Sequence, residues 1–344
     1  MSMGGRPVPG VSFTRASMID NQPSTITCID NLNRPLDNRQ STLHNPPMRI
    51  IALMNQKGGV GKTTTTANLG AALAQAGKRV CLIDVDPQAH LTINYGLEPS
   101  EERVSLYDVL AEEQPFDAAM HAVGENVWIV PSSIDLAGAE IELVSVIGRE
   151  MLLRKAVDAS NARFDYILLD CPPSLGILTI NALSLAKEVI IPMQPQFLPL
   201  QGMAKLLETV QLVHKRMNPE LTVSGVVLTM FDAQAKLSNE VVAELKGFFE
   251  ASQGKGSPWS DATIYKTRIR RNIKLAECPS FGQTIFAYDP SSNGALDYKA
   301  LAQEVIGSSA KPAASAPDLP SITAPPRIEV TVHPAPIPNP ALNS

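Results

Sequence analysis

The chain has 344 residues, 44% of them hydrophobic, which is enough to bury one large α/β core or two small ones. Its formal net charge of −5 excludes a protein that is basic overall, so any contact with nucleic acid has to come from a local patch. The four cysteines form no CxxC pair, which indicates reduced thiols in a cytoplasmic protein. The sequence contains no run of 18 apolar residues, so we expect no membrane-spanning helix.

The two ends of the chain differ in composition from the middle. Residues 1–47 are rich in Asn, Pro, Ser and Thr and show no sustained helical or strand period, which predicts a flexible arm. Residues 308–344 are dominated by Pro, Ala and Ser and predict a disordered, extended tail. The region between them, residues 48–307, is expected to hold the folded domain.

In this central region short apolar runs alternate with helical patterns. Runs typical of buried strands cover residues 49–54, 80–85, 127–130, 166–169, 189–191 and 223–229. Helical spacing covers residues 62–76, 135–159, 175–186, 199–217 and 235–251. Buried strands that alternate with helices predict an α/β fold, with a mostly parallel twisted sheet and helices on both faces.

A glycine-rich turn joins the first predicted strand to the first predicted helix. Backbone N–H groups at such a helix start bind anions, and glycines let the backbone wrap closely around phosphate oxygens. Lys62 can reach the β- and γ-phosphates, and the Thr63 hydroxyl can ligate Mg²⁺. The predicted nucleotide-binding residues are Gly58, Gly59, Val60, Gly61, Lys62, Thr63 and Thr64. The pattern therefore predicts a P-loop that binds ATP and Mg²⁺.

Three aspartates follow two later strands. Asp84 and Asp86 come at the end of the second apolar run, and Asp170 comes at the end of the run at 166–169. One strand-end aspartate is more often a turn or cap residue. Three of them behind a P-loop favour a site where one carboxylate supports Mg²⁺ and another holds the attacking water.

The loop departs from the ordinary P-loop pattern. Gln56 takes the place of the first glycine, and a second lysine, Lys57, follows it. This variant resembles the deviant Walker A loop of the ParA/MinD family of ATPases. Residues 55–66, 80–88, 135–144, 170–174 and 277–282 are similar to the ParA/Soj branch, the bacterial chromosome- and plasmid-partition ATPases. The similarity runs from about residue 49 to 307.

The resemblance implies roles for residues at matching positions. Lys57 would cross a dimer interface to the partner's nucleotide, and Asp86 would position the hydrolytic water. Asp84 would lie near the metal, and Asp170 would be the Walker B residue. Such proteins sandwich two ATP molecules in a homodimer that binds nucleoid DNA without sequence preference, and a ParB-type partner stimulates their slow ATP hydrolysis.

A basic segment is the candidate DNA contact. Residues 263–276 contain no acidic residue, and their basic residues are Lys266, Arg268, Arg270, Arg271 and Lys274. Non-specific DNA binding depends mainly on phosphate neutralisation, which such a patch can supply. A solvated basic loop, or arginines paired with nearby acidic residues, would give the same composition. Asn293 stands where the family often has a basic residue, so part of the usual DNA surface is in doubt.

Other functions remain open at this point. A relative that positions division sites at a membrane would carry a basic amphipathic helix at its C-terminus. Residues 308–344 contain only one lysine, Lys311, and one arginine, Arg327. Nitrogenase-iron-protein relatives need cysteines for an iron–sulfur cluster, and these four do not match. A positioning ATPase for another large cargo, or a static nucleotide-binding scaffold, would share most of these motifs.

Overall fold

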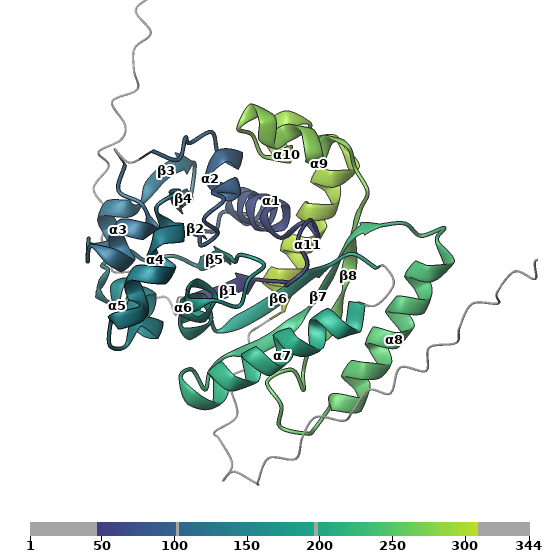
Figure 1. The fold of residues 1–344 in the computed structure, drawn as a ribbon. Coiled ribbons are helices and arrows are strands. Elements are labelled where there is room, and N and C mark those ends of the chain that lie inside the picture. Colours follow the sequence, from purple (N-terminus) through teal and green to yellow (C-terminus); the bar gives the residue numbers. More distant parts are fainter. Residues whose placement is uncertain (1–46, 101–102, 196–198, 309–344) are drawn as a thin grey trace, which may run out of the picture. The chain divides into compact units, whose positions relative to one another are not determined.

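A computed structural model describes residues 47–100, 103–195 and 199–308 of the chain. Within these ranges an eight-stranded sheet has the order β3-β4-β2-β5-β1-β6-β7-β8 (Figure 1). The strands are β1 (Arg49–Leu53), β2 (Val80–Asp84), β3 (His121–Gly124), β4 (Val127–Val130), β5 (Tyr166–Asp170), β6 (Glu188–Met193), β7 (Thr222–Phe231) and β8 (Thr263–Arg270). Every neighbouring pair runs parallel except β3 and β4. The predicted fold class is confirmed.

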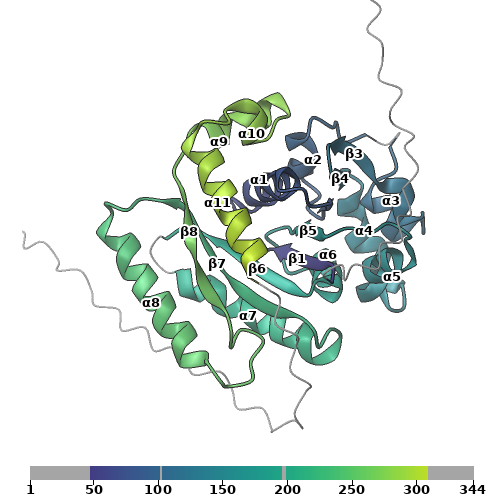
Figure 2. The same cartoon turned by 180° about the vertical axis from the view of Figure 1, so that it is seen from behind.

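Helices cover both faces of the sheet (Figures 1 and 2). On one face lie α3 (Leu106–Ala111), α4 (Leu136–Glu142), α5 (Leu152–Ala159), α6 (Ile177–Leu185), α7 (Pro199–Arg216) and α8 (Lys236–Ser252). On the other lie α1 (Lys62–Gln75), α2 (His90–Asn94), α9 (Lys274–Glu277), α10 (Ile285–Tyr288) and α11 (Asn293–Gly307). Short 3₁₀ turns occupy Phe116–Ala119, Leu143–Ser145, Arg149–Met151 and Cys278–Phe281.

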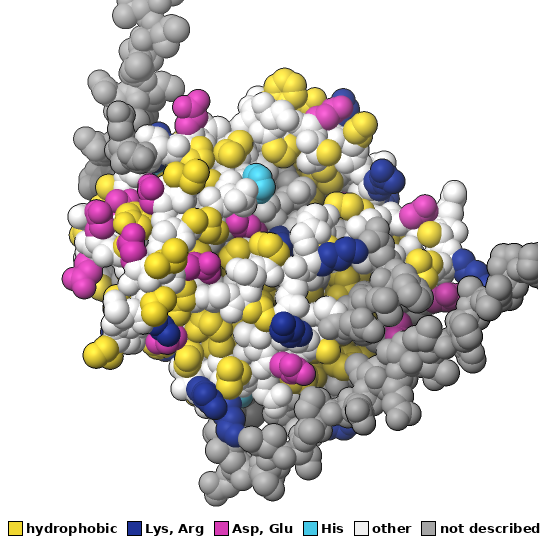
Figure 3. Space-filling view, viewed as in Figure 1, with side chains coloured by type: hydrophobic (Ala, Val, Ile, Leu, Met, Phe, Trp, Pro, Cys, Tyr) yellow, Lys and Arg dark blue, Asp and Glu magenta, His cyan; other side chains and the backbone are white. Residues whose placement is uncertain are grey.

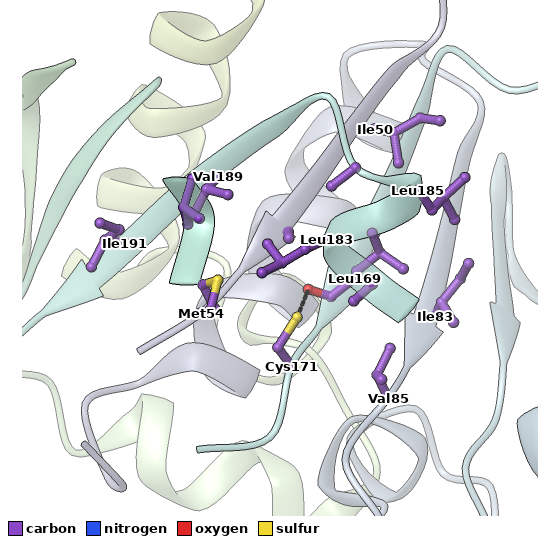
Figure 4. Close-up of a cluster of buried hydrophobic side chains, with 14 of the residues drawn as sticks. Ile50, Met54, Ile83, Val85, Leu169, Cys171, Leu183, Leu185, Val189 and Ile191 are labelled. Carbon is purple, nitrogen blue, oxygen red and sulfur yellow. Dashed lines mark hydrogen bonds between the residues drawn. The ribbon is translucent and has the colours of Figure 1, made fainter. Parts of the chain in front are cut away.

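The pleat of the central strands divides their side chains between two cores. In β1, Ile50 and Ala52 face the α4–α8 side, whereas Ile51 and Leu53 face α1 and α11. Figure 4 shows part of the first core, where Ile50, Ile83 and Leu169 come from three neighbouring strands. Because both faces are buried, the central strands read as continuous apolar runs rather than alternating ones.

One expectation about a single element was wrong. The helix predicted over 135–159 is interrupted: α4 ends at Glu142, Gly148 takes a left-handed φ of 73°, and α5 begins at Leu152. One strand was not predicted: the basic stretch at 263–276 begins as β8, an edge strand of the sheet.

The carboxylates of α11 bind the backbone of β8. Glu304 accepts hydrogen bonds from the backbone nitrogens of Lys266 (2.7 Å) and Thr267 (2.9 Å), and Asp297 accepts from that of Arg270 (3.0 Å). These contacts satisfy edge groups that would otherwise lack a partner in the sheet. Helix α11 therefore fixes the strand that carries the basic residues.

The expected N-terminal arm (1–47) and C-terminal tail (308–344) lie outside the described residues, apart from Pro47 and Ser308. In the part of the chain that is described, no helix combines the length and apolar character that crossing a membrane requires. Cys81, Cys171 and Cys278, which fall within that part, are free and buried.

Candidate nucleotide-binding site

The glycine-rich turn connects the end of β1 to the first residue of α1, Lys62. Gly59 (φ 70°) and Gly61 (φ 83°) adopt left-handed backbone conformations, which side chains with a Cβ disfavour. A Cβ added to Gly58 or Gly59 would meet no described atom within 4 Å. The loop thus has open space beside it at a helix N-terminus, as phosphate binding requires.

Two side chains that sequence reasoning missed hold this loop in place. Asn55 donates to the carbonyl of Pro192 on β6 (2.8 Å) and accepts from the backbone nitrogen of Lys57 (3.0 Å). Thr229, buried on β7, donates its hydroxyl hydrogen to the Val60 carbonyl (2.8 Å). Asn55 directly follows the first apolar run, which is a weak signal; nothing in the sequence around Thr229 marks it.

The two lysines of the loop have different surroundings. Lys62 is buried, with 7% of its surface exposed, at the start of α1. Lys57 is exposed at the other end of the turn. The buried position of Lys62 suits contact with a phosphate bound in the loop of its own chain. The exposed position of Lys57 suits contact with a group on another molecule.

Asp170 lies at the end of β5, one strand away from β1. The Thr66 hydroxyl donates to its Oδ1 (3.1 Å), whereas its Oδ2 is buried without a hydrogen-bond partner among the described residues. Burial raises the pKa of Asp170 to about 7, although the hydroxyls of Thr63 and Thr66 and the charge of Lys62 lower it. An added cation would stabilise the ionised carboxylate.

Asp84 lies opposite Asp170 in the β2–β5 pairing, but its oxygens already have partners. Thr92 on α2 donates to Oδ2 through both its backbone nitrogen (2.8 Å) and its hydroxyl (2.7 Å). The Asp86 nitrogen donates to Oδ1 (3.3 Å). Burial, and then the neighbouring Asp170, raise the pKa of Asp84 well above its ordinary range, while Thr92 lowers it. Asp84 thus binds mainly Thr92 on α2 and makes a longer contact with the turn that carries Asp86.

Asp86 is largely buried, with 9% of its area exposed. Its Oδ1 accepts from the backbone nitrogen of Gln88 (3.0 Å), which fixes the turn after β2. Because that turn leaves the same edge of the sheet as the P-loop, the carboxylate can orient a water molecule near a bound nucleotide.

The residues fit a magnesium ion. The unpartnered Oδ2 of Asp170 and the Thr63 hydroxyl beside the same carboxylate are the hard oxygen ligands that Mg²⁺ prefers. Among the described residues, no three His, Cys, Asp or Glu side chains form a ready metal cluster. This agrees with an ion held by one or two protein oxygens together with nucleotide phosphates.

The basic residues of the candidate DNA patch differ in their surroundings. Arg270 forms a bidentate pair with Asp297 (2.7 Å from Nη2 to Oδ1 and 3.0 Å from Nε to Oδ2), and Lys274 pairs with Glu277 (3.1 Å). Arg268 packs over the ring of Phe231, with its guanidinium carbon 4.3 Å from the ring centroid. Lys266, on β8, and Arg271, in the turn that follows, have exposed side chains. The alternative of arginines paired with acidic neighbours therefore holds for Arg270.

Comparisons with known proteins agree with this geometry. A family model described as an AAA domain matches residues 48–223. The Soj sporulation initiation inhibitor protein of Bacillus subtilis is 47% identical over 258 residues, covering 75% of this chain and 98% of that protein. The chromosome partitioning protein ParA of Myxococcus xanthus is 41% identical, covering 75% of this chain and 88% of that protein. One similar solved structure is that of cobyrinic acid a,c-diamide synthase from Mycobacterium smegmatis with bound ADP and magnesium. It is 34% identical in sequence, and the match covers 76% of this chain and 94% of that one, with a TM-score of 0.64.

Proposed function

Since this chain belongs to the ParA/Soj family of P-loop ATPases and uses ATP and Mg²⁺, we propose that bound ATP joins two copies into a dimer that binds DNA without sequence preference. In this proposal the dimer segregates or positions chromosome or plasmid DNA, and a ParB-type partner stimulates ATP hydrolysis. The observation that carries it is the contrast between the buried Lys62 and the exposed Lys57 in one phosphate-binding loop.

Each residue has a separate role in the proposed site. Lys62 and the backbone of the loop bind the phosphates, with Val60 held by Thr229 and Thr64 in the first turn of α1. Thr63 and Asp170 would hold Mg²⁺, which neutralises phosphate charge when it is bound. Asp86 orients the attacking water.

Two substitutions test the chemistry. Lys62→Ala should abolish nucleotide binding, because it removes the buried cation of the loop. Asp86→Ala should retain ATP but lose turnover, which a filter-binding assay and a phosphate-release assay measure separately. Asp86→Ala protein that hydrolyses ATP at the wild-type rate would rule out the role given to this carboxylate.

The dimer is tested in the Asp86→Ala background, where ATP persists. Light scattering should give a dimer with ATP and a monomer with ADP, because a ligand that bridges two subunits drives their association. Adding Lys57→Ala should weaken that dimer while leaving ATP binding to the monomer within a few fold. Association that is the same in ATP, ADP and no nucleotide would reject the bridging model.

The proposed DNA surface now centres on Lys266 and Arg271. The side chain of Arg271 forms no ion pair or hydrogen bond with the residues that the structure describes, so its charge can meet a phosphate. Each phosphate contact gives a slope of about −0.9 in log K against log salt, so a monomer with few contacts binds weakly. A dimer sets two such surfaces on one duplex and gains from effective concentration.

Arg271→Glu should therefore abolish DNA binding while ATP-driven dimerisation survives. Lys155→Glu makes the same change of charge on an exposed residue of α5, which lies at the other end of the sheet (Figure 1), and should leave DNA binding unchanged. Loss of binding in both variants would indicate a general effect of net charge. Normal binding by Arg271→Glu would move the DNA surface elsewhere.

A related proposal differs in the cargo. A family member that positions another large assembly, or acts at a membrane, would keep the ATP switch and lose the DNA contact. Asn293, exposed at the first position of α11, occupies a place where the family often has a basic residue. Normal ATP dimerisation without DNA binding in either nucleotide state would favour this alternative.

A further inference from the structure

An exposed apolar surface lies beside the nucleotide site. It comprises large aliphatic residues of α4 and the segments that flank it: Ile134, Ile141, Val144, Val146 and Ile147. We call it the α4 surface. Ile147 is 97% exposed and Ile141 is 78% exposed, so these side chains gain nothing from the core of their own chain. Figure 3 shows hydrophobic side chains gathered over the part of the face where Figure 1 places α4 and α5. Clustered exposure of this kind marks an interaction site.

The α4 surface belongs to the same edge of the sheet as the P-loop. The segment after β4 bonds to the aspartate network, since the Ser132 nitrogen donates to the Thr92 hydroxyl (3.0 Å) and Thr92 holds Asp84. Helix α4 also lies against the loop after Asp170: a Cβ on Gly176 would collide with the carboxylate of Glu140. Contacts thus run from the phosphate site through that loop to α4.

We infer that a second copy of this chain covers the α4 surface in the ATP-bound dimer. This inference rests on the dimer proposed above and names the surface that stabilises it. For Lys57 to reach the partner's nucleotide, the two nucleotide-site edges must close on each other, and groups on those edges then lose contact with water. A stable interface buries about 800 Å² on each partner around an apolar centre. Gly58 and Gly59 supply little of that area, whereas the α4 surface supplies aliphatic side chains.

The interface of a twofold dimer uses each patch twice, so one substitution acts at two places. The test pairs the double variant Ile141→Ser/Ile147→Ser with the control Leu212→Ser. Leu212 is a similarly apolar residue, 47% exposed, on α7. Helix α7 leaves the carboxyl end of β6, so Leu212 lies about 20 Å along the helix from that edge.

Association is measured by sedimentation of full-length protein with a non-hydrolysable ATP analogue and Mg²⁺. The wild type and Leu212→Ser should dimerise alike, and the double variant should dimerise on the order of a hundredfold more weakly. Its affinity for the analogue at low protein concentration and its thermal unfolding should match the wild type, because both side chains are exposed. In the wild type, amide exchange in residues 134–147 should slow with the analogue but not with ADP.

The outcomes separate the two claims. If the wild type and the double variant dimerise equally and exchange in 134–147 does not change, the inference is wrong while the proposed dimer stands. If the double variant dimerises normally and loses only partner-stimulated hydrolysis, the surface binds the activator and the inference is also wrong. If the wild type fails to dimerise with the analogue, the proposed function fails, and the inference that depends on it fails too.

Discussion

Replacing Arg49 with Met tests how the structure secures the helix that covers β8. The Arg49 guanidinium forms two hydrogen bonds of 2.7 Å with Glu188 at the start of β6. It also donates to the carbonyls of Val305 and Ser308 (2.8 Å to the latter) at the end of α11. The two charged side chains are only 10% and 6% exposed, so neither can replace its partner with bulk water.

The expected loss in the free energy of unfolding depends on which charged group each substitution leaves buried without its partner. Arg49→Met leaves the Glu188 carboxylate buried without its cation, which should lower the free energy of unfolding by about 3–5 kcal/mol. Glu188→Leu should cost less, about 1–3 kcal/mol, because the guanidinium keeps two carbonyl acceptors at α11. The double variant buries no unpaired charge, so it should be more stable than the sum of the single changes by about 2 kcal/mol.

Urea unfolding of the nucleotide-free protein measures all four species, with unchanged m-values as the check that only stability has changed. Nucleotide affinity of the folded fraction should stay at the wild-type value, because Arg49 lies at the end of β1 opposite the P-loop. An Arg49→Met protein within about 1 kcal/mol of wild type, or strict additivity in the double variant, would refute this reasoning.

Three further predictions concern the site. Thr229→Val removes the hydroxyl that holds the Val60 carbonyl and should weaken ATP binding several-fold in a fluorescent-nucleotide titration, whereas unchanged affinity would show that the loop holds its shape without it. Gly61→Ala puts a Cβ on a residue with φ 83°, which costs about 1–2 kcal/mol and should lower ATP affinity about tenfold in the same assay; wild-type affinity would contradict this. The folded-state pKa of Asp170 is about 7 against an ordinary 3.8, so the folded protein binds the extra proton and its stability should fall as pH rises between about 4 and 7. Asp170→Asn should reduce that fall in unfolding experiments; an unchanged pH dependence would count against a buried, ionisable Asp170.

Sequence reasoning was sufficient for the strand–loop–helix unit and the sheet class. The glycines between an apolar run and a helical run specify local backbone geometry, and buried parallel strands leave a continuous apolar pattern. Asn55 and Thr229 could not be found in this way, because their partners are backbone carbonyls brought near by the fold.

The basic segment shows a different limit. Composition at 263–276 suggested a patch or a loop, yet Tyr265 and Ile269 are buried on β8 while Lys266 and Arg270 are exposed. The two buried residues are four positions apart and Thr263 is exposed, so β8 lacks the regular alternation by which a half-buried strand is predicted. The pairing of Arg270 with Asp297 joins residues 27 positions apart and depends on α11 packing beside the strand.

The prediction of one unbroken helix over 135–159 was wrong for a local reason. The sequence Val146-Ile147-Gly148 continues the apolar character of α4, but Gly148 adopts φ 73° and redirects the chain before α5. Ile141, Val144 and Ile147, on the α4 side of this break, are exposed although they are strongly apolar, so hydrophobicity alone does not show which face of α4 is buried.

A titration of random-sequence DNA at two salt concentrations, with either a non-hydrolysable ATP analogue or ADP bound, shows whether the nucleotide controls DNA binding. We expect tight, salt-sensitive binding with the analogue, much weaker binding with ADP, and a steeper salt slope for the dimer than a single patch allows. Equal DNA binding in the two nucleotide states would contradict this expectation.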